Sequence, residues 1–217
     1  MFRKTLHFFG FAPFLLTSAL AISSSVAPPS NAFGAFCEAP AVVKQTQKEF
    51  HQVVKPLADL ISKGEGDYNA VNRGYAGDTP GGIQGLTGLT FENYTVGQVM
   101  DMQRHRLFAV GRYQFIPVTL RFAVAMSDVD RLDMFTPETQ DKLFAALLLY
   151  KRPAVGAYIR GNHDHQGWAL NELAKEWASV EYRYGRGFYD HIGGNRAHIT
   201  RTEAASALEE VRADYSA

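Results

Sequence analysis

The sequence predicts a mainly α-helical fold, formally α+β, with a small irregular lobe of loop and short strand. Apolar residues recur every three or four positions in several segments, which is the period of an amphipathic helix. Capping residues and first-turn prolines mark the starts of these segments. Residues 64–95 differ, because they hold eight glycines and no such period. We expect no helix there, but a long functional loop or a small irregular sheet.

Composition excludes several classes of protein. The 217 residues include 22 basic and 22 acidic side chains, and 46% are hydrophobic, which is enough for one substantial core. A nucleic-acid partner is disfavoured, because phosphate neutralisation needs an excess of lysine and arginine. The single cysteine, Cys37, excludes an internal disulfide framework and a cysteine-based zinc site. We expect a monomeric globular protein with no cofactor, no metal and no nucleic-acid partner.

The first 32 residues predict a secretory signal peptide. Arg3 and Lys4 precede an apolar stretch that is too short for a membrane span and that ends near small-residue sites. The alternative is a retained N-terminal anchor. We expect a linker over residues 33–40 and one folded domain over residues 41–217. Without the leader the chain has 20 basic and 22 acidic residues and a net charge of −2.

The first helix is expected to begin at Ala41. Its apolar residues continue at helical spacing as far as Ile61. Pro56 lies inside this pattern and should kink or split the helix. We expect the helix to end at Gly64, because glycine commonly terminates helices.

The remaining helices are predicted by their caps and prolines. Thr95 with Gln98, and Thr200 with Glu203, have the spacing of a capping box. A third start has the cap Thr136 followed by a first-turn proline. The expected helices begin at Thr95, at Pro117 and at Thr136 (ending before Pro153), and span 153–160, 166–178 and 201–213. A short break is expected at 109–114, and residues 181–194 are aromatic and glycine-rich.

Glu65 is the first candidate for chemistry. It lies between Gly64 and Gly66, where the first helix gives way to the glycine-rich segment. Flanking glycines allow a substrate or another backbone to approach closely. A carboxyl shielded by apolar neighbours has a raised pKa and can donate a proton near neutral pH. The alternative is an ordinary solvated glutamate at a helix end.

The second candidate is the segment Gly111-Arg112-Tyr113-Gln114. Glycine, an aromatic ring and an amide together suit a sugar. The Tyr113 ring would stack on the apolar face of a pyranose, and the Gln114 amide would hydrogen-bond hydroxyl or acetamido groups. The alternative is a plain turn into the next helix.

Several motifs occur in one order along the chain. A helix ending in Glu-Gly and a Gly/Asn-rich stretch precede Gly-Arg-Tyr-Gln-Phe-Ile-Pro at 111–117, Phe-Thr-Pro-Glu-Thr-Gln-Asp at 135–141, Ile-Arg-Gly at 159–161, and Trp-Ala-Ser at 177–179 followed by Tyr184-Gly185. Over about residues 50–190 this order resembles the lysozyme-like superfamily. The resemblance is strongest to lambda-type phage endolysins, which are lytic transglycosylases.

The resemblance implies a lysozyme-like catalytic domain with a glycan cleft beside the irregular lobe. Glu65 matches the family's catalytic glutamate, and Trp177 matches a tryptophan expected in the core. Tyr113 and Gln114 match residues that contact the glycan near the reacting bond, and Tyr184 matches an aromatic at the far side of the cleft. The expected substrate-binding residues are Asn72, Gly111, Tyr113, Gln114 and Tyr184.

The chemistry depends on whether Glu65 acts alone. Hydrolytic glycosidases commonly use two carboxylates. Asp67 and Asp78 are the possible partners, although a hydrogen bond within a turn explains either residue equally well. If neither lies opposite Glu65, a single-acid mechanism fits, and the resemblance implies its course: the glutamate protonates the glycosidic oxygen. It then acts as base while the sugar's own 6-hydroxyl attacks, which gives a 1,6-anhydro product.

The resulting hypothesis is an exported enzyme that cuts the β-1,4 MurNAc–GlcNAc bond of peptidoglycan in the periplasm or cell envelope of a bacterium. Lytic transglycosylation is the first expectation, and an envelope or secretion machinery is a possible further partner. The alternatives are a hydrolytic muramidase and a non-cutting, glycan-binding scaffold. A metal-dependent hydrolase centred on His163 and His165 is a weaker alternative. The slight negative charge favours a controlled enzyme over a broadly lytic one.

Overall fold

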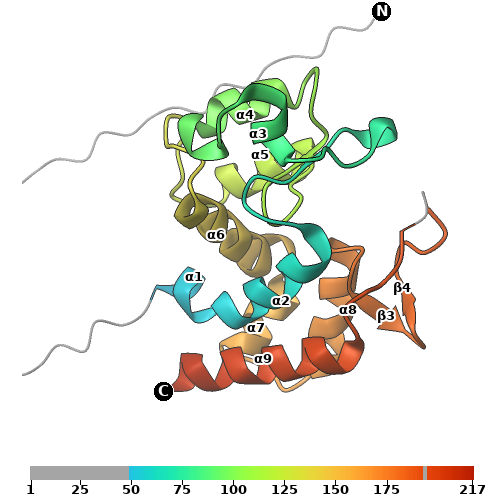
Figure 1. The fold of residues 1–217 in the computed structure, drawn as a ribbon. Coiled ribbons are helices and arrows are strands. Elements are labelled where there is room, and N and C mark those ends of the chain that lie inside the picture. Colours follow the sequence, from blue (N-terminus) through green and yellow to red (C-terminus); the bar gives the residue numbers. More distant parts are fainter. Residues whose placement is uncertain (1–48, 193–194) are drawn as a thin grey trace, which may run out of the picture. The chain divides into compact units, whose positions relative to one another are not determined.

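A computed structural model of the chain describes residues 49–192 and 195–217 (Figure 1). These residues belong to one unit of dense internal contacts, Thr46–Ala217. The expected signal peptide, the linker over 33–40 and the expected helix start at Ala41 lie outside the described residues.

The described part of the chain is mainly helical, which confirms the predicted class in its coarse form. The helices are α1 Phe50–Val53, α2 Lys55–Glu65, α3 Gly82–Thr87, α4 Val96–Met102, α5 Pro117–Ala125, α6 Pro137–Ala146, α7 Pro153–Ile159, α8 Gln166–Glu176 and α9 Arg201–Ser216. The short helical turns are η1 Gly74–Ala76, η2 Phe91–Asn93 and the π-helical η3 Leu147–Lys151. The strands are β1 Val71–Asn72, β2 Ala109–Val110, β3 Glu181–Arg183 and β4 Arg186–Gly187.

The first predicted helix is divided as Pro56 required. Val54 separates α1 from α2, and the proline lies in the first turn of α2, where its missing N–H costs no hydrogen bond. The predicted end at Gly64 is wrong. The helix continues through Glu65 and ends at Gly66, whose φ of 147° is open to glycine and strained for other residues.

The glycine-rich segment forms a small lobe. Strand β1 pairs antiparallel with β2, with Val71 opposite Val110. Of the two predicted forms, a long loop or a small irregular sheet, the structure has the small sheet. The expectation that the segment contains no helix is wrong, because α3 lies within it. Gly81 and Gly88 flank α3 in left-handed conformations, and Ile83 anchors it with a fully buried side chain.

The later helices begin where their caps and first-turn prolines predicted. Both predicted capping boxes are present, at Thr95 with Gln98 and at Thr200 with Glu203. Helix α6 begins after its Thr136 cap, and its extension η3 ends before Pro153 as expected. Helix α8 ends at Glu176, two residues earlier than expected, because the chain turns to an extended conformation at the next residue.

Helix α6 packs against α1, α2, α5 and η3 and lies between the upper and lower helices in Figure 1. Phe144 stacks on Tyr113 with ring centroids 4.4 Å apart and packs against Trp177 at 5.0 Å. The apolar side chains of α6 and η3 that recur at helical spacing are fully buried or nearly so, namely Leu143, Phe144, Leu147 and Leu148. Trp168 of α8 is not part of the core, because 55% of its surface is exposed.

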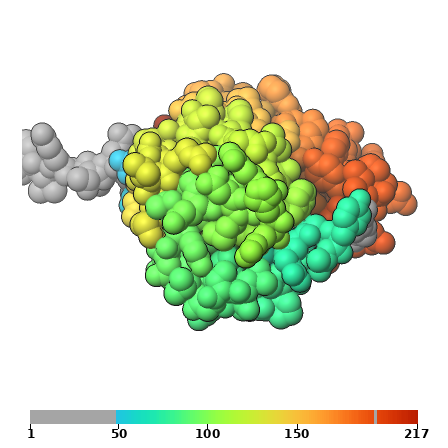
Figure 2. Space-filling model, turned by 90° about the horizontal axis from the view of Figure 1, so that it is seen from above, coloured from blue at the N-terminus to red at the C-terminus, as the bar shows by residue number. Residues whose placement is uncertain are grey.

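Two views together show how the segments are layered. Helices α3, α4 and α5 form the upper part of Figure 1, and α2 packs against α9 below them. Seen from above, residues of the green and yellow-green segments cover this face, and the orange C-terminal segments lie beyond them (Figure 2). Within residues 49–192 and 195–217, no helix is long and apolar enough to cross a membrane.

Candidate active site

A cavity of about 430 Å³ opens between the end of α2 and the small lobe. Glu65, Gln114 and parts of 66–71 and 78–84 line it. Glu65 is the last residue of α2, and its side chain forms part of the cavity wall. The predicted catalytic glutamate therefore lies in a hollow that a polar ligand can reach.

The Glu65 carboxyl has a neutral partner. The Ser179 hydroxyl donates to its Oε1 over 2.6 Å, and the Ser179 backbone N–H approaches the same oxygen at 3.4 Å. Among the described residues, no lysine or arginine is paired with Glu65. Burial raises the pKa of this carboxyl above its ordinary value, and the nearby Asp78 charge acts in the same direction. The two Ser179 hydrogen bonds and His198 oppose this rise without cancelling it.

Gly64 makes the contact between Glu65 and Ser179 possible. A Cβ added at Gly64 would lie 2.3 Å from the Ser179 Cβ, which is far inside van der Waals contact. The glycine next to Glu65 is thus required for close approach of the chain after α8, and not as a helix terminator. The predicted close approach of another part of the chain is confirmed at Gly64, and only its predicted function as a helix terminator is wrong.

Gln114 also lines the cavity, as predicted. Its backbone has a φ of 48°, and its Nε2 donates to the Gly111 carbonyl over 3.0 Å. A Cβ at Gly66 would lie 3.9 Å from this Nε2, so the amide approaches the residue that follows Glu65. The amide and the carboxyl therefore face one cavity from different segments.

Tyr113 does not present its ring to a ligand. The side chain is only 2% exposed, and the ring is stacked on Phe144 inside the core. Its hydroxyl donates to Asp141 Oδ1 over 2.5 Å. The prediction that this ring stacks on a sugar is wrong, because both of its faces are occupied by protein.

Gly111 holds the small lobe in place and does not line the cavity. Its N–H donates to the Ala70 carbonyl over 2.8 Å, and its φ is 73°. A Cβ here would lie 2.3 Å from Gln140 Oε1. The prediction that Gly111 contacts the substrate is wrong, because this residue packs against Gln140 and Ala70 instead.

Arg112 joins three segments behind the cavity. Its guanidinium donates to Asp59 on α2 over 2.5 Å and to the Tyr68 hydroxyl over 2.7 Å. Tyr68 in turn donates to Asp141 of α6 at 3.0 Å. Burial raises the pKa of the Tyr68 phenol, and the Asp141 charge adds to the rise. The network fixes the chain on both sides of the Glu65 cavity.

Gln140 is the second fixed point. This fully buried amide accepts from the Arg112 backbone N–H at 2.9 Å and donates to the Tyr68 carbonyl at 3.0 Å. Sequence reasoning singled out the segment 135–141 as a motif but gave Gln140 and Asp141 no function. The same is true of Ser179, which lies in the Trp-Ala-Ser motif.

The possible second carboxylates, Asp67 and Asp78, both line the cavity, and each accepts a hydrogen bond within a turn. Asp78 lines the cavity and accepts from Asn72 Nδ2 over 2.8 Å. Asn72 itself does not line the cavity and instead orders the turn through its Oδ1, which accepts from Gly74 N–H. Asp67 accepts from the Asn69 N–H at 2.7 Å, which confirms the expected turn hydrogen bond.

Tyr184 lies apart from this cavity. It occupies the turn between β3 and β4 with a φ of 56° and is 96% exposed. It is absent from the cavity lining, so its expected place at the cleft is not reproduced.

A metal centre finds no support among the residues that the structure describes, because no three His, Cys, Asp or Glu side chains cluster suitably. His163 stacks on Trp168 at 5.4 Å, and its Nε2 lies 3.1 Å from the Ala154 carbonyl. His163 therefore has a packing function.

Comparison with known proteins gives no further guide. No protein-family model, no curated protein and no solved structure matches this chain.

Proposed function

We propose that the protein is an exported peptidoglycan-cleaving enzyme with Glu65 as its general acid and base. The observation that carries the proposal is a carboxyl of raised pKa in an open cavity, held by a neutral hydroxyl. A carboxyl in this setting keeps its proton to a higher pH than a free glutamate does, which a general acid requires. The order of sequence motifs supplies the substrate class.

The reaction that fits best uses Glu65 alone. Its proton passes to the glycosidic oxygen as the bond from that oxygen to the anomeric carbon of the muramic acid breaks. The 6-hydroxyl of the same sugar then attacks the anomeric carbon and returns its proton to Glu65. The product is a 1,6-anhydro sugar, and no water is consumed. Gln114 faces the same cavity and would hydrogen-bond the sugar's polar groups.

A hydrolytic muramidase is the second candidate, and Asp78 favours it. This aspartate lines the same cavity, and its charge acts on Glu65. In that reaction a second carboxylate would activate water or form a covalent intermediate. The hydrogen bond from Asn72 holds Asp78 in the turn, which is why we place the single-acid reaction first.

The test is digestion of purified peptidoglycan followed by mass spectrometry of the soluble fragments. We expect anhydro-ended fragments from the wild type, and a loss of at least about 100-fold in rate for Glu65→Gln. Glu138→Gln, an exposed glutamate on α6, is the matched control and should retain full activity. Full activity of Glu65→Gln would refute the proposal, and binding to walls without release of sugar would indicate a scaffold.

Asp78→Asn separates the two enzymatic candidates. A single-acid transglycosylase should keep most of its rate and still release anhydro ends. A two-carboxylate hydrolase should lose activity in this variant, and its wild type should release reducing-end muramic acid.

A further inference from the structure

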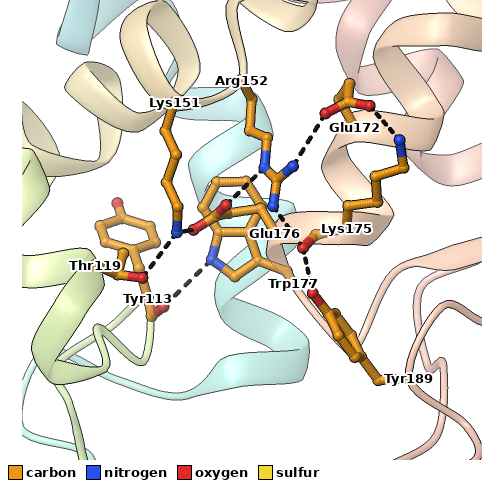
Figure 3. A network of polar contacts seen from close by, with 9 residues as sticks. All are labelled: Tyr113, Thr119, Lys151, Arg152, Glu172, Lys175, Glu176, Trp177 and Tyr189. Atoms are coloured by element: carbon orange, nitrogen blue, oxygen red, sulfur yellow. Dashed lines mark hydrogen bonds and ion pairs between the residues drawn. The ribbon is translucent and has the colours of Figure 1, made fainter.

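A second pocket, of about 130 Å³, adjoins the active site and shares Gln114 with it. Its charged lining consists of Lys151, Arg152, Lys175 and Glu176 (Figure 3). We call it the cationic pocket. The volume exceeds that of several waters, at about 30 Å³ each, so a carboxylate group fits inside.

The chain connects this pocket directly to the Glu65 site. Lys175 and Trp177 line the cationic pocket, and two residues further on Ser179 donates to Glu65. Trp177 Nε1 also donates to the Tyr113 carbonyl over 3.3 Å, next to Gln114 (Figure 3). A substrate held at Glu65 therefore has its neighbouring groups within reach of this pocket.

The π-helical turn η3 places two consecutive cations on the pocket. The Arg152 N–H donates to the Leu147 carbonyl, five residues back, over 2.8 Å. This wider turn brings both Lys151 and Arg152 onto the side that faces α8, as Figure 3 shows. Such π-helical turns occur frequently at functional sites.

The network around the pocket carries a net positive charge. Glu176, whose side chain is 4% exposed, accepts from Lys151 over 2.6 Å and from Arg152 over 2.7 Å. Glu172 pairs with Arg152 and Lys175. Three cations thus face two carboxylates. Residues 49–217 as a whole contain 18 basic and 21 acidic side chains, so this local excess runs against the charge of the domain.

The cations also keep donors that this network does not use. Lys151 Nζ donates to Glu176 and to Thr119 Oγ1, which uses two of its three N–H groups. Arg152 makes three hydrogen bonds to the described residues out of five N–H groups. The N–H groups that remain on Lys151 and Arg152 are available to bind a further anion.

We infer that the cationic pocket binds a carboxylate of the substrate, carried by the acidic peptides attached to the glycan strand. This inference rests on the proposed function. Lys151 and Arg152 hold the carboxylate by charge-assisted hydrogen bonds while the sugar chain occupies the Glu65 cavity. The pocket thereby selects strands that bear peptides with free carboxyl groups over bare strands.

The test measures binding to the Glu65→Gln protein, which does not turn the ligand over. Three glycan fragments of equal length are compared: one with free peptide carboxyls, one with those carboxyls amidated, and one without peptides. We expect the first to bind about tenfold more tightly than the other two, because charge-assisted hydrogen bonds are the strong ones. Equal affinity for the three fragments would overturn the inference.

Variants locate the preference. Lys151→Met should abolish it and Lys151→Arg should retain it. If circular dichroism shows that Lys151→Met is unfolded, Lys175→Met replaces it and should reduce the preference. Lys142→Met is the matched control, because Lys142 and Lys175 are 35% and 34% exposed and each pairs with a glutamate of its own helix. A preference that survives in Lys151→Met, or in Lys175→Met where that variant replaces it, places the carboxylate elsewhere and overturns the inference.

The readouts separate this inference from the proposed function. Cleavage of peptide-free strands by the wild type, with equal affinity for all three fragments, refutes the cationic pocket alone. Absence of cleavage and of binding for every fragment refutes both.

Discussion

Helix α2 carries two carboxylates in opposite settings, Asp59 in its first half and Glu65 at its end. Asp59 is paired with Lys55 at 2.7 Å and with Arg112 at 2.5 Å. Burial raises its pKa, but the hydrogen bonds and charges of these two cations outweigh burial and lower the pKa below its ordinary value. Glu65 contacts a neutral hydroxyl instead, and burial raises its pKa. The partners decide which carboxyl has a lowered pKa and which one has a raised pKa.

The helix geometry separates the two settings. An α-helix turns by about 100° per residue, and Glu65 follows Asp59 by six residues. Their side chains therefore point about 120° apart around the helix axis. Asp59 thereby faces Arg112 and the network behind the cavity, whereas Glu65 faces Ser179. One helix therefore anchors the network with one acid and presents the other to the cavity.

Removal of Arg112 should break this arrangement and have the largest effect on stability. Arg112→Met leaves Asp59 and the Tyr68 hydroxyl without their shared donor and should lower the free energy of unfolding by about 3 kcal/mol. Urea denaturation measures this. Arg121→Met, an exposed arginine on α5, is the control and should change stability by less than about 0.5 kcal/mol. Equal effects of the two variants would show that the network does not hold the domain together.

Ser179→Ala should increase the difference between the pKa shifts of Glu65 and Asp59, because it makes Glu65 still harder to ionise. The Ser179 hydrogen bonds lower the pKa of Glu65, so loss of the hydroxyl raises it further. If the protonated glutamate is the general acid, as we propose, the alkaline limb of the kcat/KM profile should move to higher pH. We expect kcat/KM to fall about tenfold near the optimum through looser orientation of the carboxyl. Ser127→Ala is the control, and an alkaline limb that moves to lower pH would contradict the assignment.

Local sequence was sufficient to place Glu65 at a helix end and Gln114 in a turn that begins with glycine, and both residues line the cavity. It was not sufficient for Ser179, which meets Glu65 across 114 residues. Only the packing of the chain after α8 against Gly64 brings the two together. The segment 177–179 was recognised as a motif, but its chemistry depends on a distant partner.

Tyr113 shows a different limit. An aromatic residue in a glycine-flanked turn suits a ligand surface and a core anchor equally well. The outcome was decided by Phe144 and Asp141, which lie on α6 and provide a stacking face and an acceptor. The helix starts were predictable because caps are local, whereas the orientation of this ring depends on a helix that begins 24 residues later in the sequence.

The two acids of α2 should give stability changes of opposite sign, the smallest effects predicted here. The folded protein holds the Glu65 proton above the ordinary pKa of 4.5, so the cost of ionising Glu65 grows as pH rises from there through the raised pKa. Glu65→Gln escapes this cost and should be about 1 kcal/mol more stable than wild type near neutral pH. The gain should vanish in acid, where Glu65 is protonated in both the folded and the unfolded wild type.

Asp59 contributes stability above its ordinary pKa of 3.8, and this stability is lost as pH falls through its lowered pKa. Asp59→Asn should therefore cost about 0.5 kcal/mol near neutral pH, a small value because the side chain is 46% exposed and solvent screens its ion pairs. Urea denaturation of both variants across acidic and neutral pH measures this, and a shift of the same sign in both would mean that their partners do not distinguish them.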